Sequence, residues 1–290
     1  MFAYNRPRHL SRLIDSLFGN ELFLHSPVFV FCDGPRNQAD LEAVAQTRSV
    51  ARQRLGSLGQ IKESESNNGL AQSIIAGVTE LCNSHGRVIV FEDDLVLHSR
   101  CLNFVNAALR YYANDPRIYH VNAYRYPLPP AAAPNYSRLI SSWGWATWQR
   151  AWVDFEPAAA RLEQRIRDAG LISYMDFGGT FPYYAMLKSQ AQNKIDSWAI
   201  RWYASALLGR GLAICPNISQ VSNTGFDNSG VHCGVSSSYN VELGTASEDW
   251  PAEVSEDMLN YRQMQAFFRS IRGALPTRVL RRLKRVLLAN

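Results

Sequence analysis

The stretch Arg87-Val88-Ile89-Val90-Phe91-Glu92-Asp93-Asp94 joins an apolar run to three consecutive acids. The apolar residues predict a buried β-strand, because strands covered on both faces are almost continuously hydrophobic. Three carboxylates at the end of such a strand repel one another and raise each other's pKa unless a cation neutralises them. Mg²⁺ and Mn²⁺ prefer oxygen ligands, and often take one or two protein carboxylates together with substrate phosphates. The stretch therefore predicts a site for a metal-bound diphosphate, and a solvated turn is the alternative.

Strands and helices alternate around this stretch. Apolar runs predict further strands at residues 27–32 and 118–121, and residues 8–18 and 102–112 have the apolar spacing of helices. This alternation predicts an α/β fold with a parallel, doubly wound sheet. Ligands of such sheets bind beyond the carboxyl ends of the strands. Asp33 and the three acids both fall at such ends, which favours a functional interpretation of the acids.

The opening residues 1–5 have the pattern of a strand whose first half is missing. We therefore expect the strand to begin upstream of Met1. The chain that starts at Met1 would then be less stable and would bind nucleotide weakly. A longer form that melts no higher would contradict this expectation.

The composition is that of a globular protein. The chain has 290 residues, of which 47% are hydrophobic, enough for one large domain or two small ones. No apolar stretch approaches the length of a membrane-spanning helix, and the early basic residues are not followed by a signal-peptide core. The five cysteines are scattered and lack a CxxC spacing, which indicates a reducing compartment and argues against a structural zinc site.

Several motifs together resemble the GT-A-fold inverting glycosyltransferases, in the branch typified by N-acetylglucosaminyltransferase I and shared by bacterial family 2-like sugar transferases of surface-polysaccharide pathways. In chain order they are Asn5-Arg6, Asp33, Asn68-Gly69-Leu70, Val90-Phe91-Glu92-Asp93-Asp94, Asn114-Asp115-Pro116, Gly144-Trp145 and Asp196-Ser197-Trp198. The resemblance implies a GT-A-type domain with a mixed central sheet. It also implies inverting transfer from a nucleotide diphosphate sugar, assisted by Mn²⁺ or Mg²⁺.

The resemblance also implies a role for each motif residue. Asp94 would bind the metal, Asp93 the ribose and Glu92 the donor sugar. The remaining roles are uracil binding by Asp33, a place near the nucleotide for Arg6, a border of the donor and acceptor sites for Trp145, and general-base catalysis by Asp196. His232, in a glycine-rich loop, is a candidate metal or diphosphate ligand, as late histidines are in several enzymes of this fold.

Each of these residues also has a structural interpretation. Asp196 precedes a predicted helix and is a good N-cap. Asp33 opens an Asp-Gly-Pro turn. Trp145 belongs to a tryptophan cluster, and such clusters usually pack in a core. His232 would be a solvated loop side chain.

The net charge of +5 belongs to residues 273–290, which carry five basic residues and no acid. The rest of the chain is balanced, so a nucleic-acid partner is not indicated. Apolar residues recur at helical spacing between these basic residues, which predicts a basic amphipathic helix on an anionic membrane. Packing of this helix on the main domain is the alternative. We therefore divide the chain into a GT-A catalytic domain, residues 1–272, and a tail, residues 273–290.

The sequence as a whole predicts a metal-dependent glycosyltransferase at the cytoplasmic face of the membrane. Its donor would be a UDP-linked sugar, and its acceptor a glycan or a lipid-linked sugar of a bacterial surface polysaccharide. A nucleotidyltransferase or phosphohydrolase would use the same acids without a sugar acceptor. A non-catalytic nucleotide-sugar-binding protein would bind UDP without turnover.

Overall fold

The computed structural model describes residues 1–225 and 238–272. Its strands are β1 (Phe2–Ala3), β2 (Val28–Cys32), β3 (Gly59–Glu63), β4 (Arg87–Val90), β5 (Leu95–Leu97), β6 (Ile118–Asn122), β7 (Asn135–Ser137), β8 (Trp145–Trp148), β9 (Leu212–Cys215) and β10 (Val221–Asn223). Its α-helices are α1 (Pro7–Phe18), α2 (Leu41–Leu55), α3 (Leu70–His85), α4 (Cys101–Tyr111), α5 (Gln149–Trp152), α6 (Ala159–Asp168), α7 (Ile172–Met175), α8 (Tyr183–Ala191), α9 (Trp198–Leu208) and α10 (Met258–Arg272).

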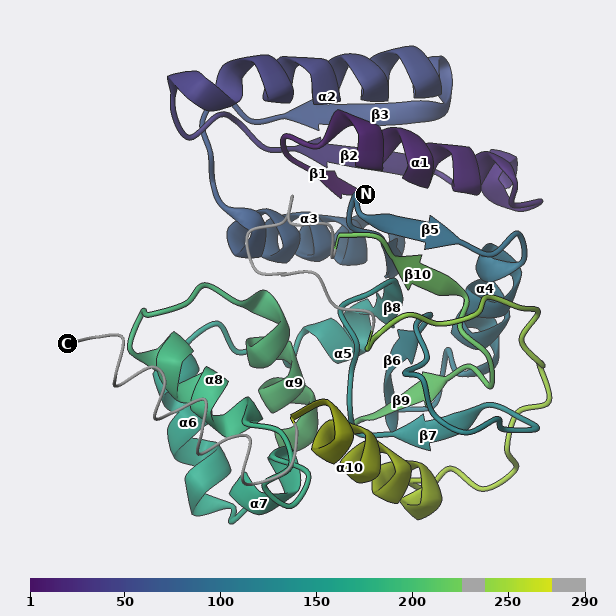
Figure 1. Cartoon of the computed structure of the whole chain (residues 1–290), viewed down its shortest axis with the longest axis vertical. Helices are drawn as coiled ribbons and strands as arrows, with labels where there is room; N and C mark the ends of the chain where they lie inside the picture. Colours follow the sequence, from purple (N-terminus) through teal and green to yellow (C-terminus); the bar gives the residue numbers. More distant parts are fainter. Residues whose placement is uncertain (226–237, 273–290) are drawn as a thin grey trace.

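The strands form a mixed central sheet (Figure 1). β1, β2 and β3 are parallel in the order β1-β2-β3, and a second group has the order β4-β8-β6-β9-β7. The two groups meet where the N–H of Phe2 donates to the carbonyl of Phe91 at 3.0 Å and Phe2 bridges Glu92 in parallel. In the second group β6 and β9 are parallel, whereas β8 and β7 run antiparallel to their neighbours. The predicted α/β class with a mixed sheet is confirmed.

Helix α1 shows how the sequence sets the positions of the site residues. The predicted apolar face of this helix, Leu10, Leu13, Ile14 and Leu17, is buried. Pro7 occupies the first turn, where its missing N–H costs no hydrogen bond. Three residues separate β1 from the helix, and the last of them, the N-cap residue Arg6, lies at the carboxyl end of that strand.

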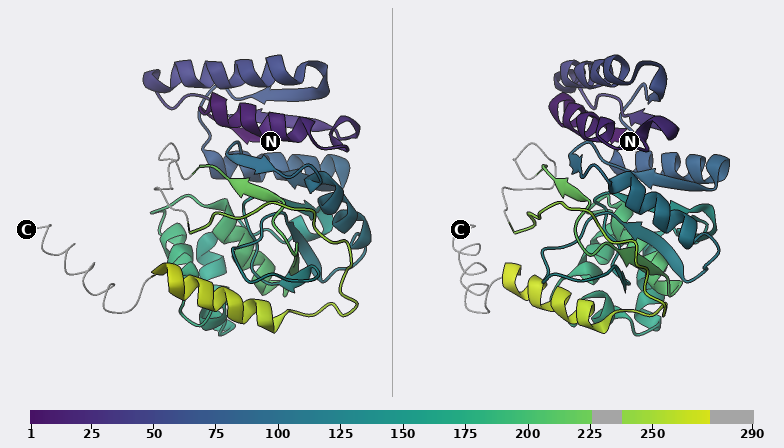
Figure 2. Two further views of the ribbon diagram at one scale, coloured as in Figure 1. Left: turned by 45° about the vertical axis from the view of Figure 1, so that its right-hand side comes forward. Right: turned by 90° about the vertical axis from the view of Figure 1, so that its right-hand side faces the viewer.

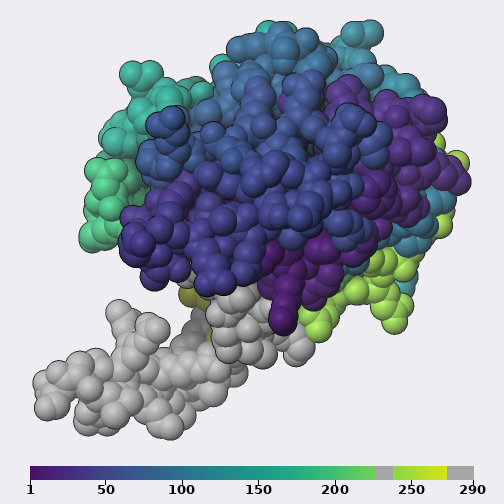
Figure 3. All heavy atoms as spheres, turned by 90° about the horizontal axis from the view of Figure 1, so that it is seen from above, coloured from purple at the N-terminus to yellow at the C-terminus, as the bar shows by residue number. Residues whose placement is uncertain are grey.

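The amino-terminal elements and helices α6–α9 lie on different sides of the second strand group (Figure 1). α1, α2 and the strands β1–β3, drawn in purple and blue, lie together at the top of the molecule, above the second strand group (Figure 1, Figure 2). Seen from above, the surface is formed largely by these amino-terminal elements, drawn in purple and blue (Figure 3). Helices α6–α9 pack beside the second strand group around a core that includes Leu162, Leu187 and Tyr203.

Helix α10 adds Met264 and Phe268 to that same core. Within the ranges that the structure describes, no helix is both long enough and apolar enough to cross a membrane. The predicted amphipathic tail, residues 273–290, and His232 lie outside the described residues. The predictions that rest on them therefore remain predictions.

Candidate functional site

The three acids lie at the carboxyl end of β4, beside the end of β1. Asp93 is buried, with 4% of its surface exposed. The guanidinium of Arg6 donates from Nη2 to the carboxylate of Asp93 and to Oδ2 of Asp94, the latter at 3.1 Å. Arg6 is therefore a cation that neutralises the acids, as the sequence pattern requires. Its Nη1 is buried and has no hydrogen-bond partner among the described residues, so it is an unsatisfied donor beside the acids.

Burial dominates the electrostatics of the acids. It raises the pKa of Asp93 to about 6, against the attraction of the Arg6 guanidinium. Burial, together with the charges of Asp94 and Asp93, raises the pKa of Glu92 well above its ordinary value. Positive charge added at this point would lower both pKa values, because an opposite charge favours the ionised form of a carboxyl group. The site is therefore suited to a cation beyond the single guanidinium.

We expect Asp93→Asn to flatten the pH dependence of stability between about pH 4 and pH 6. The folded state of the native protein holds the Asp93 proton up to about pH 6, whereas the unfolded chain releases it near pH 3.8. The native protein therefore loses stability as the pH rises through this window, by about 3 kcal/mol from this group. Asparagine carries no charge at any of these pH values and removes the slope.

Urea unfolding in metal-free buffer at pH 4, 5, 6 and 7 measures this effect. Asp40→Asn is a control of opposite sign, because hydrogen bonds from Tyr4 and Arg36 lower the pKa of Asp40. Parallel stability curves for the native protein and Asp93→Asn would contradict the prediction.

The chain that follows β10 lies against Asp94. β10 pairs antiparallel with β5, and Thr224 donates to the backbone carbonyl of Asp94 from its N–H at 2.8 Å and from Oγ1 at 2.9 Å. A Cβ atom on Gly225 would lie 2.4 Å from Oδ2 of Asp94, too close for a side chain unless the carboxylate moved. The glycine therefore lets the backbone approach a predicted metal ligand closely.

Asp33 is placed at the end of β2, as predicted, but the fold uses both of its oxygens. Oδ1 accepts from the backbone N–H groups of Gly34 at 2.9 Å and Asn68 at 2.8 Å, and Oδ2 accepts from the N–H of Gly69 at 2.9 Å. Gly69 has a φ of 82°, a left-handed backbone that favours glycine. Asp33 thus fixes the turn that begins α3, and its contact with a uracil ring remains a prediction.

Asp196 is exposed, and it is not the cap of α9. Ser197 is the N-cap, because its hydroxyl accepts from the N–H of Ile200 at 3.3 Å. The side chain of Asp196 is 62% exposed and accepts one hydrogen bond, from Nη2 of Arg201 to Oδ1 at 3.1 Å. Its Oδ2 lies 3.7 Å from the position that a Cβ on Gly69 would take. Asp33 and Asp196, which are far apart in the sequence, therefore both lie next to the turn at Gly69.

Trp145 lies in the core. Its indole is fully buried in β8, and its ring stacks on those of His120 and Trp198, with centroids 5.1 and 4.9 Å away. The structure therefore agrees with the interpretation of Trp145 as a packed core residue, and its place at the border of the donor and acceptor sites remains a prediction. Trp145 packs on Trp198, the first residue of α9, which follows Asp196 and Ser197 in the sequence.

Sequence reasoning missed some neighbours of the site. Arg201, which is 12% exposed, holds Asp196, and Arg48 donates to the backbone carbonyl of Asp33 at 3.2 Å. Tyr4 donates to Asp40 at 2.6 Å next to the end of β1. Arg201 lies on α9, five residues after Asp196, which precedes the helix, so no i, i+4 spacing in the sequence indicated its role.

The residues present fit a hard dication. Asp93 and Asp94 supply carboxylate oxygens and face Arg6, and such ions often take one or two protein carboxylates and complete their shell with phosphates and water. Across residues 1–225 and 238–272, no group of three or more His, Cys, Asp or Glu side chains could hold a metal by itself. A metal held here would therefore be coordinated by a bound phosphate as well as by protein carboxylates.

No protein-family model matches the chain, and no curated protein matches it. Among solved structures, the fold is similar to that of a mannosyltransferase from Pyrobaculum calidifontis in complex with GDP-Man and Mn²⁺. The two share 13% identity over 71% of this chain and 72% of the other, with a TM-score of 0.38. A likeness of this size gives no information on substrate. The class that the structure itself defines is an α/β protein with a mixed sheet and an acidic, arginine-paired site at the carboxyl end of β4.

Proposed function

We propose that this protein is a metal-assisted, inverting glycosyltransferase that uses a nucleotide diphosphate sugar. The observation that carries the proposal is the buried Asp93 and the partly buried Asp94 beside Arg6, whose Nη1 has no hydrogen-bond partner among the described residues. Paired acids and a free guanidinium donor together suit a diphosphate with a dication. The position at the carboxyl ends of β1 and β4 is where α/β sheets bind nucleotides.

Asp94 would hold the ion in this proposal, and Arg6 would donate to a phosphate oxygen. A dication at this place supplies a Lewis acid that offsets the negative charge of the leaving diphosphate. Glu92 and Asp93 would contact the donor sugar and ribose, and Asp33 would face a uracil base. The Asp33 bonds to the α3 turn hold that part of the site rigid.

Asp196 would remove the proton from the acceptor hydroxyl. A hydroxyl is a poor nucleophile until a base within hydrogen-bond reach takes its proton. The carboxylate is exposed, is not used as a helix cap, and is oriented through Oδ1 by Arg201. Its Oδ2 is then the oxygen free to accept the proton.

The acceptor in this proposal is a glycan or lipid-linked sugar of a bacterial surface polysaccharide. The basic tail, residues 273–290, would bring the enzyme to the cytoplasmic face of the membrane, where such acceptors lie. A nucleotidyltransferase or phosphohydrolase remains the second candidate, because it would use the same acids and would give Asp196 no role.

We expect one nucleoside diphosphate, UDP on this proposal, to raise the melting temperature only when Mn²⁺ is present. A ligand at 100 times its Kd stabilises the native state by about 2.7 kcal/mol, which is a shift of several degrees. Thermal melting with UDP, GDP, CDP and ADP, each with and without Mn²⁺, measures it. The shift should vanish in Asp94→Asn and persist in Asp168→Asn, a matched change on the exposed end of α6. No shift with any nucleotide would remove the donor site from the proposal.

A further inference from the structure

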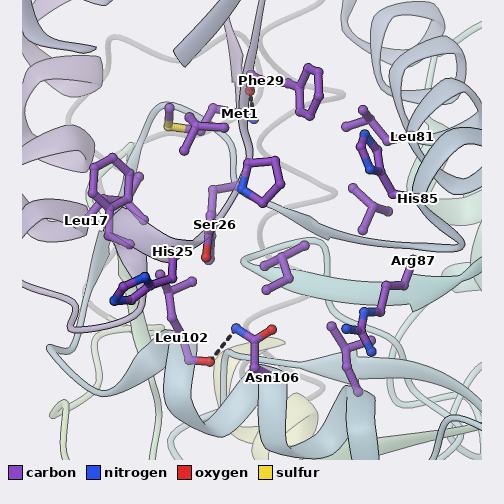
Figure 4. A pocket seen from close by; sticks show the side chains of 17 residues that line it. Met1, Leu17, His25, Ser26, Phe29, Leu81, His85, Arg87, Leu102 and Asn106 are labelled. Atoms are coloured by element: carbon purple, nitrogen blue, oxygen red, sulfur yellow. Dashed lines mark hydrogen bonds between the residues drawn. The ribbon is translucent and has the colours of Figure 1, made fainter. Parts of the chain in front are cut away.

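A cavity of about 350 Å³ lies at the opposite end of the sheet from the acids. It opens at the amino ends of β2 and β4, beside Val28 and Arg87. Side chains of α1, α3 and α4 surround it, among them Leu17, Leu81 and Leu102 (Figure 4). The cavity is therefore lined by helices that cover the sheet and by the backbones of β2 and β4.

The cavity coincides with a gap in the sheet. β1 lies between β2 and the end of β4, but it spans only Phe2–Ala3, whereas its two neighbours begin further toward their own amino ends. Among the described residues, the ladder of β4 runs to β8 alone, and no strand fills the space between the first residues of β2 and β4. The backbone edges of both strands therefore face the cavity.

The pairing register shows what backbone would fit there. Phe2 opposes Phe31 on one side and Glu92 on the other, both in parallel. Extending these registers toward the amino end leads into the space between two rows of backbone. On the β2 side the row is Pro27, Val28 and Phe29, and on the β4 side it is Val88, Ile89 and Val90. All of these except Val90 line the cavity.

The amino group of Met1 already follows this register. It donates to the carbonyl of Phe29 at 2.7 Å, in line with the ladder that Phe31 continues by donating to the carbonyl of Met1 at 2.9 Å. Met1 is 8% exposed, and burial lowers the pKa of its amino group to about 5. An amide N–H at this point would make the same hydrogen bond without placing a charge in the interior.

We propose that the cavity is a strand slot, and that its occupant is extended polypeptide joined to the nitrogen of Met1 and paired in parallel with β2 and β4. Apolar residues of the occupant would contact Leu17, Leu81 and Leu102, and polar side chains such as His25 and Asn106 complete the lining. The proposal rests on strand pairing and is independent of any catalytic activity. It bears on the acidic site because β1 directly precedes Arg6.

Variants with four added residues ahead of Met1 test the proposal. Val-Ile-Val-Val can pair and fill the slot. Gly-Ser-Gly-Ser removes the buried charge but has poor strand propensity, and Val-Pro-Val-Pro keeps apolar bulk but lacks half of the N–H donors. We expect the first extension to raise the melting temperature by roughly 5 °C or more, and the other two to give clearly smaller shifts.

Hydrogen exchange gives a second, local measurement. In the Val-Ile-Val-Val variant, the backbone amides of Phe29, Ile89 and Phe91, which face the slot in the register of β1, should exchange more slowly than in the chain that starts at Met1. Equal shifts for all three extensions would mean that removal of the charge is the whole effect, and would overturn the slot. Unchanged exchange in these amides would overturn it as well. Equal protection of these amides in the chain that starts at Met1, when the free peptide Val-Ile-Val-Val is added to it, would also overturn the slot. The occupant would then not need to be joined to Met1.

Discussion

Asp196→Asn is expected to lower the rate of sugar transfer by a factor of about 10² to 10⁴, the usual contribution of a general base. The substitution keeps the size of the side chain and an oxygen that can accept from Arg201, so it removes only the ability to take a proton. Because the side chain is 62% exposed, stability should change by less than about 0.5 kcal/mol. Transfer from a nucleotide sugar to a set of sugar acceptors, followed by product analysis, measures the rate.

Nucleotide binding separates this prediction from a general loss of structure. The Mn²⁺-dependent thermal shift should be the same in Asp196→Asn and in the native protein, because the proposal places Asp196 on the acceptor side alone. Asp168→Asn should leave both measurements unchanged. Acceptor-independent cleavage of the donor that survives in Asp196→Asn at its native rate, with no transfer to any acceptor by the native protein, would instead favour a phosphohydrolase.

The first half of the fold could be predicted because its elements have strong local patterns. The apolar face of α1 and the continuous apolar runs of β2 and β4 are such patterns, and all three elements lie within two residues of their predicted bounds. β3 could not be recognised, because Gly59–Glu63 is a polar, half-exposed strand at the edge of the sheet. Its pairing with β2, rather than its own sequence, makes it a strand.

The second half hid its strands for the opposite reason. All four residues of β8 are buried, since it lies between β4 and β6, so its sequence shows no alternation. Its two tryptophans indicate a cluster and not a strand. β5 and β10 have three residues each and are defined by pairing across a long stretch of chain. Contacts of this kind leave no periodic signal in the sequence.

The candidate site was predicted best where a residue's position follows from the end of a strand. This holds for Asp33 and for the three acids after β4. Arg6 was predicted near the nucleotide, but its pairing with Asp93 and Asp94 joins segments far apart in the chain. The close approach of Gly225 to Asp94 is also a product of tertiary packing. Sequence spacing carries no information on either contact.

Arg6→Met is expected to destabilise the protein by about 3 to 5 kcal/mol at pH 7, the usual result of removing one partner of a buried ion pair. Methionine keeps much of the apolar length of the side chain but leaves Asp93 and Asp94 facing each other without a cation. Asp93 is 4% exposed, so water cannot replace the lost hydrogen bond. Urea unfolding in metal-free buffer measures the change.

The loss should be smaller at pH 5 than at pH 7. Removal of the guanidinium raises the pKa of Asp93 further above its already raised value, so at pH 5 the folded variant holds this carboxyl protonated and uncharged. As the pH rises toward 7, the variant must either keep that proton or bury a bare charge, and either state costs free energy relative to the unfolded chain. Arg6→Lys should fall between the two proteins, because it keeps the charge and loses the planar fork.

Arg36→Met is the matched control. Arg36 also pairs with an aspartate near the end of β1, at 3.1 Å from Asp40, but its side chain is 50% exposed. Exposed pairs contribute about 0 to 1 kcal/mol. The difference between the two variants therefore isolates the effect of burying charge at the acidic site. Equal losses in Arg6→Met and Arg36→Met, with no dependence on pH, would show that Arg6 does not neutralise the acids, and the electrostatic basis of the site would then have to lie elsewhere.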